Sequence, residues 1–308
     1  MLNNKISGTI EVYKKNTTDL LGEYQVPVPP NFFRLTYKNT GEMENKGIEL
    51  FLQTYPVSKK NFTWKTSMNI SHNKTIIVDL GSETEGNLRK EGYISGRGMV
   101  GDEYYLIGLI EGQPLGAFYL PTFVKIQDGK FIYKSKTGGY TDNLSEAQRT
   151  IVGNATPDLE IGWTNSITLF KNWNIDFSFR ALIGNDVYNA TQMFFDNPQI
   201  LPSLNANQAA IDWYNQGRTA SSTIADFYME NATFLRLDYL SVGYNFKFKK
   251  SNMVKNLTIY AASNNLFTIT GYSGVDPETT IKGLSYGIDQ YNVYPKTRTI
   301  TFGIKGTL

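Results

Sequence analysis

Apolar and polar residues alternate along several stretches of the 308-residue chain. Alternation is clearest over residues 62–70, 173–183, 240–248 and 300–308. Successive side chains of a β-strand point to opposite faces, so a period of two sustained over nine or more residues predicts a strand. Weaker alternation predicts four further strands, over 5–13, 46–55, 161–169 and 256–267. The pattern therefore predicts eight amphipathic strands.

One face of these strands is apolar. On the apolar side of the four clearest strands no position carries a charge, although 19% of the chain is charged. Such a face lies against a protein core or against lipid, and alternation alone fits both environments.

The lengths of the connections between the strands favour lipid over a protein core as the environment of the apolar face. Short connections at 56–60, 170–172 and 249–253 alternate with long ones at roughly 14–45, 72–160, 184–232 and 269–295. All short turns then lie at one end of the sheet and all long loops at the other, as in outer-membrane barrels. The strands also suit a tilted bilayer crossing of about 9–11 residues. We predict an antiparallel transmembrane β-barrel segment with long extracellular loops and short periplasmic turns.

Composition narrows the possible chemistry. Thirty Lys and Arg residues nearly balance 28 Asp and Glu residues, so charge gives no reason to expect nucleic acid. Cysteine is absent and His72 is the single histidine, which excludes disulfides, thiolate metal sites and cysteine nucleophiles. We expect His72 to be a solvated residue at the loop-side end of its strand. We expect no enzyme activity, cofactor or metal.

Six motifs follow one another along the chain. They are NKGIEL (45–50), EGQPLGAFY (111–119), GNATP (153–157), FLRL (234–237), NNLFTIT with YSGVDPE (264–278), and YPKTRTITFG (294–303). In this order and spacing the set resembles the C-terminal part of SusC/RagA-type TonB-dependent outer-membrane transporters of Bacteroidetes. The resemblance covers nearly the whole chain.

The resemblance implies a 22-stranded barrel with a plugged lumen, to which this chain would contribute about eight strands. It implies import of glycans, peptides or other large nutrients across the outer membrane. The implied partners are a SusD-like surface lipoprotein, the TonB–ExbB–ExbD complex acting through an N-terminal region, and the barrel-assembly machinery. We expect residues 1–308 to be the C-terminal portion of such a barrel, without plug domain, TonB box or signal peptide.

Three groups of residues are candidates for function. Loop aromatics could stack on sugar rings or peptide side chains, or simply pack the loops together: Tyr104, Tyr105, Tyr119, Trp213 and Tyr214. A family loop motif pairs two carboxylates around a proline, which indicates a loop turn or, alternatively, a cation site: Asp276, Pro277 and Glu278. The closing strand would face lipid and signal barrel assembly through Ile300, Phe302, Ile304 and Leu308.

Two other classes stay open. A self-contained small outer-membrane barrel would act as a pore or, with a clustered base and nucleophile on one rim, as an enzyme. A soluble β-sandwich would act as a binding module and would behave as a monomer without detergent.

Overall fold

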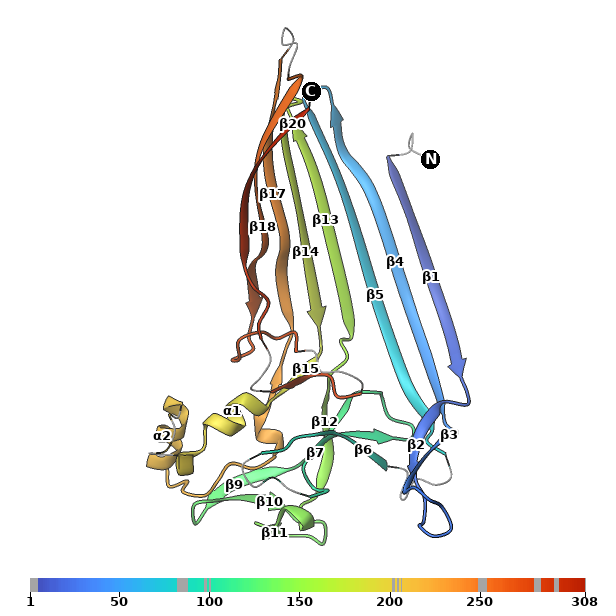
Figure 1. Ribbon diagram of the computed structural model, residues 1–308, viewed down its shortest axis with the longest axis vertical. Coiled ribbons are helices and arrows are strands. Elements are labelled where there is room, and N and C mark those ends of the chain that lie inside the picture. Colours follow the sequence, from blue (N-terminus) through green and yellow to red (C-terminus); the bar gives the residue numbers. More distant parts are fainter. Residues whose placement is uncertain are drawn as a thin grey trace.

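Eight long antiparallel strands form one curved sheet, the strand wall (Figure 1). The computed structural model describes residues 5–81, 88–96, 99, 101–200, 203, 205, 207–248, 254–279, 284–290 and 294–307. In spatial order the wall consists of β1 (Ile6–Thr17), β4 (Glu42–Lys59), β5 (Phe62–Asp79), β13 (Leu159–Leu169), β14 (Trp173–Ile183), β17 (Phe234–Lys247), β18 (Asn256–Thr270) and β20 (Thr299–Thr307). Each strand pairs with the next wall strand in sequence, and all eight predicted strands are present.

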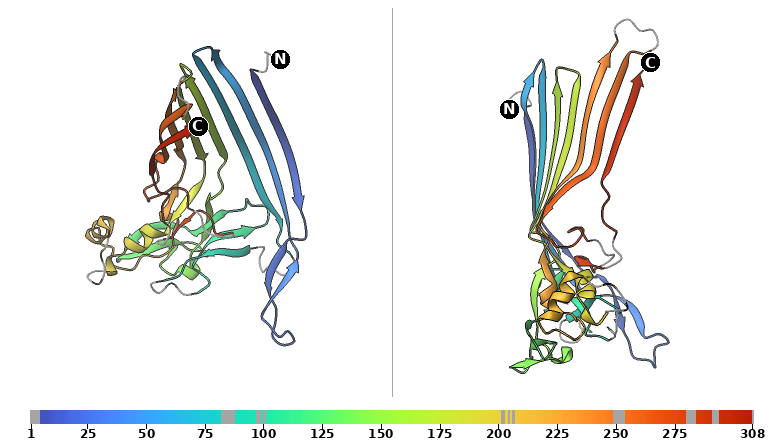
Figure 2. Two further views of the ribbon diagram at one scale, coloured as in Figure 1. Left: turned by 45° about the horizontal axis from the view of Figure 1, so that its top comes forward. Right: turned by 90° about the vertical axis from the view of Figure 1, so that its left-hand side faces the viewer.

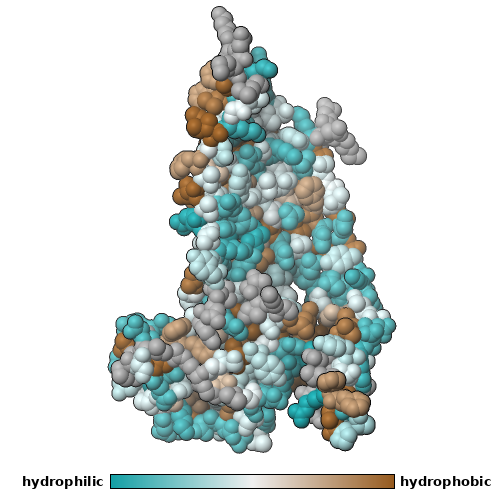
Figure 3. All heavy atoms as spheres, viewed as in Figure 1, coloured by the Kyte–Doolittle hydropathy of each residue, from teal (hydrophilic) through white to brown (hydrophobic). Residues whose placement is uncertain are grey.

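The pairing register keeps the apolar side chains on one face. Leu50 lies opposite Ile70, Ile70 opposite Ile161, and Ile161 opposite Ala181. Because side chains alternate between faces, this register places the apolar side chains of neighbouring strands together on one face, here called the outer face. The opposite, inner face is mainly polar. In Figure 3 apolar side chains follow the edge formed by the last strands, whereas the face toward the viewer is mainly polar.

One short connection differs from its prediction. The 56–60 segment was expected to be a turn, but β4 continues to Lys59 and the turn is formed by Lys60 and Asn61. Pro56 lies inside the strand, at a register shift between Thr54 and Val57. Proline is tolerated there because a bulge leaves a backbone position without a ladder hydrogen bond.

The predicted turn between β13 and β14 is confirmed. Phe170 and Lys171 both have positive φ, 49° and 65°, and the backbone N–H of Asn172 donates to the carbonyl of Leu169. Two consecutive residues with positive φ suit the twist of a tight hairpin. The 249–253 connection lies outside the described residues.

A bulge in β17 explains a change of pattern in the sequence. Apolar residues occupy odd positions at Leu235 and Leu237 but even positions from Leu240 onward. The register of β17 against β14 and β18 shifts at Asp238, between these two sets. The extra residue keeps the leucines on both sides of the bulge, Leu235, Leu237 and Leu240, on the outer face and lets Asp238 turn inward.

The long connections fold into a loop layer at the end of the wall opposite the short turns (Figures 1 and 2). Its strands are β2 (Leu21–Gln25), β3 (Leu35–Asn39), β6 (Leu88–Tyr93), β7 (Tyr105–Ile110), β8 (Ala117–Pro121), β9 (Phe123–Gln127), β10 (Lys130–Lys134), β11 (Tyr140–Thr141), β12 (Arg149–Asn154), β15 (Asp186–Asn189), β16 (Met229–Asn231) and β19 (Ile288–Asp289). Its α-helices are α1 (Ala190–Phe195) and α2 (Gln208–Asn215), with 3-10 turns at Leu144–Glu146, Pro198–Ile200 and Asp226–Tyr228.

The main hydrophobic core lies in this loop layer. Leu106, Ile107, Phe118, Tyr188 and Met193 are all fully buried there and belong to one cluster. Outer-face residues of the wall are far more exposed, since no protein covers them. None of the helices described by the structure has the length and apolar character needed to cross a membrane.

Candidate functional site

A segment after β18 folds back across the inner face of the wall. This return segment, residues 272–278, contains the predicted Asp276-Pro277-Glu278 motif. Its carboxylates contact arginines that project inward from β14 and β17. The motif therefore brings together groups that are far apart in the sequence.

Arg236 anchors the return segment to β17. Its guanidinium is paired on all three sides: Nη2 lies 2.6 Å from Asp276 Oδ1, Nη1 lies 3.0 Å from Glu278 Oε2, and Nε donates to Thr268 Oγ1 at 2.9 Å. The Arg236 side chain is only 2% exposed. Disrupting this arrangement is costly, because removal of either carboxylate leaves one of the buried guanidinium nitrogens without its partner.

Arg180 anchors the same segment to β14. Its Nη1 and Nη2 form a fork on the two oxygens of Glu278, at 2.9 and 2.8 Å, and its Nε lies 2.9 Å from Asp238 Oδ2. The bulge in β17 places Asp238 within reach of this arginine. Two-pronged pairing fixes orientation as well as charge.

Lys296, shortly before β20 in the connection between β18 and β20, completes the cluster. Its Nζ pairs with Glu278, and its backbone N–H donates to Asp276 Oδ2 at 3.2 Å. The inner-face cluster, defined as these six residues, holds three cationic and three anionic groups: Arg180, Arg236, Lys296, Asp238, Asp276 and Glu278. Its charges therefore balance.

The pKa of Glu278 reflects this setting. Burial alone would raise the pKa of the carboxyl, but the hydrogen bonds from Arg180 and Lys296 outweigh burial and hold it below its ordinary value. Glu278 is thus a carboxylate at neutral pH.

The first half of the return segment is held by other polar contacts. Tyr272 Oη donates to Asp289 Oδ2 at 2.5 Å, and Ser273 contacts Glu230 through its backbone N–H (2.8 Å) and its hydroxyl (2.7 Å). Burial and the Asp289 carboxylate raise the pKa of the Tyr272 phenol. The segment is therefore fixed along its length to β16, β17 and β19.

This arrangement anchors the return segment to the wall. The Asp276 and Glu278 oxygens are already occupied by guanidinium, ammonium and backbone donors. Within the described ranges no group of three or more His, Cys, Asp or Glu residues is positioned to hold a metal ion. The sequence analysis singled out the carboxylate motif and two stretches that contain Arg236 (FLRL) and Lys296 (YPKTRTITFG). It did not point to Arg180 or Asp238, since each is an ordinary charge in a strand.

The predicted loop aromatics are separated into two places. Tyr105 is 5% exposed, with the Arg149 guanidinium carbon 3.8 Å from its ring centroid and the Tyr119 ring at 6.5 Å. Tyr104 packs partly buried against the same core. These rings are built into the loop layer.

The other two aromatics lie on α2. Trp213 packs edge-on against Phe227, with ring centroids 5.1 Å apart, whereas Tyr214 is 59% exposed. Of the five candidates, Tyr214 therefore offers the most open ring. A role for any of them in substrate binding stays a prediction.

The remaining predicted residues lie on the wall. Ile300, Phe302 and Ile304 are on the apolar face of β20 and are 59%, 81% and 72% exposed; Leu308 lies outside the described residues. His72 was expected at the end of its strand, but β5 continues to Asp79. The His72 side chain is exposed, and its Nδ1 lies 2.5 Å from the Asp158 carbonyl oxygen.

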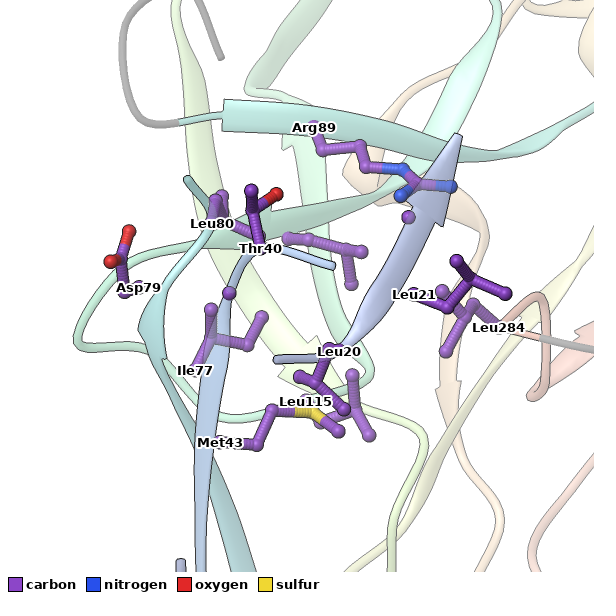
Figure 4. A pocket seen from close by; sticks show the side chains of 13 residues that line it. Leu20, Leu21, Thr40, Met43, Ile77, Asp79, Leu80, Arg89, Leu115 and Leu284 are labelled. Carbon is purple, nitrogen blue, oxygen red and sulfur yellow. The ribbon is translucent and has the colours of Figure 1, made fainter. Parts of the chain in front are cut away.

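The loop layer also contains an apolar cavity of roughly 210 Å³, shown in Figure 4. Side chains from the base of the β2–β3 hairpin, the ends of β4 and β5, and the β6–β8 sheet line it, and Leu284 of the last loop closes one side. Met43 and Ile77 mark its floor and belong to the inner face of the wall. The cavity therefore opens within the loop layer, above the inner side of the sheet.

An amphipathic wall with apolar residues outside, polar residues inside and a folded loop layer at one end defines the wall of an outer-membrane β-barrel. No protein-family model matches the chain. The chain is 29% identical to the TonB-dependent receptor SusC of Bacteroides thetaiotaomicron, over 98% of this chain and 30% of that protein. It is 26% identical to the TonB-dependent receptor P3 of Formosa agariphila, over 99% of this chain and 32% of that protein.

Solved structures give the same fold. The RagAB peptide transporter matches with a TM-score of 0.78 at 23% identity, and RagAB in the "closed-closed" state with 0.79 at 22%. The match covers 99% of this chain and 34% of either structure, so the chain spans about a third of the length of its relatives. The resemblance to SusC/RagA-type TonB-dependent transporters and the outer-membrane β-barrel fold are thereby confirmed.

Proposed function

We propose that the chain forms part of the wall and extracellular mouth of a TonB-dependent, SusC-like importer of large nutrients. Supporting this is one observation above others: the loop layer has its own core and is anchored by the inner-face cluster to the inner side of the wall. Anchored loops on a rigid wall suit the capture of a solute at the mouth of a barrel.

The parent protein would act by binding and gating. A glycan, a peptide or another large nutrient would be held between the extracellular loops and a SusD-like surface lipoprotein. The TonB–ExbB–ExbD complex would supply energy through an N-terminal region. The SusC and RagAB relatives are named as receptors and transporters, which agrees with a non-enzymatic role.

Within that protein we propose that residues 1–308 form the C-terminal portion of the barrel. The closing strand β20 would present Ile300, Phe302 and Ile304 to lipid and, with Leu308, would serve as the signal to the barrel-assembly machinery. Reading the coding DNA upstream of Met1 tests this placement. An in-frame plug domain and signal peptide would support it, and an in-frame stop with a ribosome-binding site before Met1 would contradict it.

The contact surface for substrate or lipoprotein would include Tyr214, because its ring is open at the surface of α2. Tyr104, Tyr105, Tyr119 and Trp213 would support that surface from within the loop layer.

Import is tested by removing the gene from its host. The mutant should lose growth on one class of glycan or peptide as sole nutrient, and the complete gene should restore it only in cells with working TonB. Restoration without TonB would instead indicate a passive pore. A monodisperse, detergent-free product would indicate a soluble β-sandwich and would contradict the proposal.

A further inference from the structure

The cavity in Figure 4 is lined mainly by apolar side chains. Among the described residues that line it, the apolar side chains are all aliphatic: Leu20, Leu21, Met43, Ile77, Leu80, Leu109, Leu115 and Leu284. Sugar rings are bound by stacking on flat aromatic faces together with polar groups. An aliphatic lining instead favours an alkyl group.

The floor and one wall of the cavity are rigid. The 111–115 turn is tied to β5 by three backbone hydrogen bonds, from Ile77 to Gln113 (3.1 Å), from Gly112 to Ile77 (2.8 Å) and from Leu115 to Thr75 (2.9 Å). The Leu80 N–H also donates to Glu111 Oε1 at 3.0 Å. These contacts hold an open apolar space in place, which lowers the cost of binding.

The opposite wall is the base of the β2–β3 hairpin. Backbone hydrogen bonds join Thr40 N–H to the Leu20 carbonyl (2.9 Å) and Leu20 N–H to the Gly41 carbonyl (3.3 Å). Leu21, at the first residue of β2, is 69% exposed and stands at the rim. A ligand group can therefore enter beside the hairpin.

Arg89 supplies a charge at the same rim. Its side chain extends along one side of the cavity with the guanidinium toward Leu21 (Figure 4). Its Nε lies 2.9 Å from Glu91 Oε1, and its two Nη nitrogens have no hydrogen-bond partner among the described residues. The Asp79 carboxylate points out of the cavity and accepts from the Gly81 N–H at 2.7 Å. The Arg89 Nη nitrogens can therefore donate hydrogen bonds at the rim, and a carboxylate is the group that a guanidinium binds best.

Size limits what can enter. An engineered apolar cavity of about 150 Å³ holds benzene, and drug-sized ligands need about 300 Å³ or more. At roughly 210 Å³ this cavity holds about one branched alkyl group rather than a whole ligand. The occupant is therefore one end of a larger molecule, or a small molecule of that size.

We propose that this cavity binds a short aliphatic group that carries a carboxylate, with the alkyl part among the leucines and the carboxylate on the Arg89 Nη groups. The leucine residue at the carboxyl end of a peptide has this chemistry, and so does a free fatty acid. The proposal rests on the import function above for its biological role, since it names a substrate feature of the same mouth.

Binding to the purified protein tests it without transport. The protein is placed in nanodiscs, because an alkyl detergent would compete for the cavity. Calorimetry then compares 4-methylpentanoate with the uncharged 4-methylpentan-1-ol. We expect Arg89→Gln to weaken binding of the acid about tenfold and to leave the alcohol unchanged, because a hydrogen bond to a charged group is lost only with the acid. Lys130→Gln, which breaks the surface pair with Asp142, is the matched control and should change neither.

A second pair of variants tests the cavity itself. Leu21→Phe fills the rim and should abolish binding of both ligands, while Ile151→Phe, an exposed residue of β12 outside the cavity, should not. Ligands that bind Leu21→Phe as well as the parent protein would overturn the proposal. Equal effects of Arg89→Gln on acid and alcohol would overturn the role of Arg89.

Two further ligands separate the sources. A peptide ending in leucine, compared with its C-terminal amide, reports a peptide source, and octanoate reports a fatty acid. Discrimination of the free peptide from its amide supports the first, and tight binding of octanoate alone supports the second. Because no uptake is measured, failure of binding leaves the import function standing, and loss of import leaves this site standing.

Discussion

The strand wall and the loop layer differ in what surrounds their apolar side chains. In the wall, Ile10 and Phe302 on the apolar face are 71% and 81% exposed, so that face requires lipid as its solvent. In the loop layer, Leu106 and Phe118 are fully buried, as in a water-soluble domain. One polypeptide therefore buries its apolar side chains in two ways: lipid covers those of the wall, and protein covers those of the loop layer.

The largest test of this contrast removes one phenyl group from each region. Phe118→Ala should destabilise the loop layer by about 4 kcal/mol, because it leaves a cavity in a packed core. Phe302→Ala should cost far less, since lipid fills the space. Thermal unfolding in nanodiscs, followed by protease cleavage of the loops, measures both. Equal losses for the two variants would contradict the contrast.

The junction between the two regions is the next target. Arg236→Ala should cost about 3 kcal/mol, because Asp276 and Glu278 are left without their buried partner. Limited proteolysis should then cut the return segment at a temperature at which the parent protein is resistant. The control is Arg298→Ala, an exposed arginine of the same loop, which should behave like the parent.

The two faces of the wall are distinguished by adding one charge. Phe302→Arg places a cation against lipid and should cost about 2 kcal/mol, whereas Thr301→Arg places it on the inner face of the same strand at little cost. Heat-modifiable gel migration after membrane assembly reports the folded fraction. A wall that faced protein on its apolar side would lose stability with Phe302→Ala as well.

The smallest effect is a dependence on pH at the junction. The folded-state pKa of Glu278 lies below its unfolded value, so its contribution to stability is present above the unfolded pKa and is lost as the pH falls through the folded one. Protease resistance of the return segment should therefore decline in acid. Glu278→Gln should remove this part of the pH dependence, and an unchanged profile in that variant would exclude Glu278 as its source.

Much of the wall is readable in the sequence because its rules are local. Alternation predicted where the strands form, but it did not predict the bulge at Asp238, which shifts the apolar positions from odd to even between Leu237 and Leu240. The turn at 56–60 was misplaced because a proline usually ends a strand, while here a bulge accommodates it.

The candidate sites were less predictable. Asp276, Pro277 and Glu278 stand out in the sequence, yet a carboxylate pair looks the same whether it binds a metal ion or an arginine. Tyr105 and Tyr214 are alike as loop tyrosines, but packing against Arg149 and the Tyr119 ring buries Tyr105, whereas Tyr214 stays exposed. The arginines that contact the two carboxylates and Tyr105 lie on other strands, and the sequence does not show that these strands come close to them.

By itself the sequence determined the eight strands, their apolar face, the alternation of short turns with long loops and the resemblance to SusC/RagA-type transporters. Only the tertiary structure decided that Glu278 meets Arg180, 98 residues away, and that segments from across the chain enclose one aliphatic cavity. The reason is physical: strand formation depends on neighbours two residues apart, whereas ion pairing and cavities depend on how the loops return across the sheet.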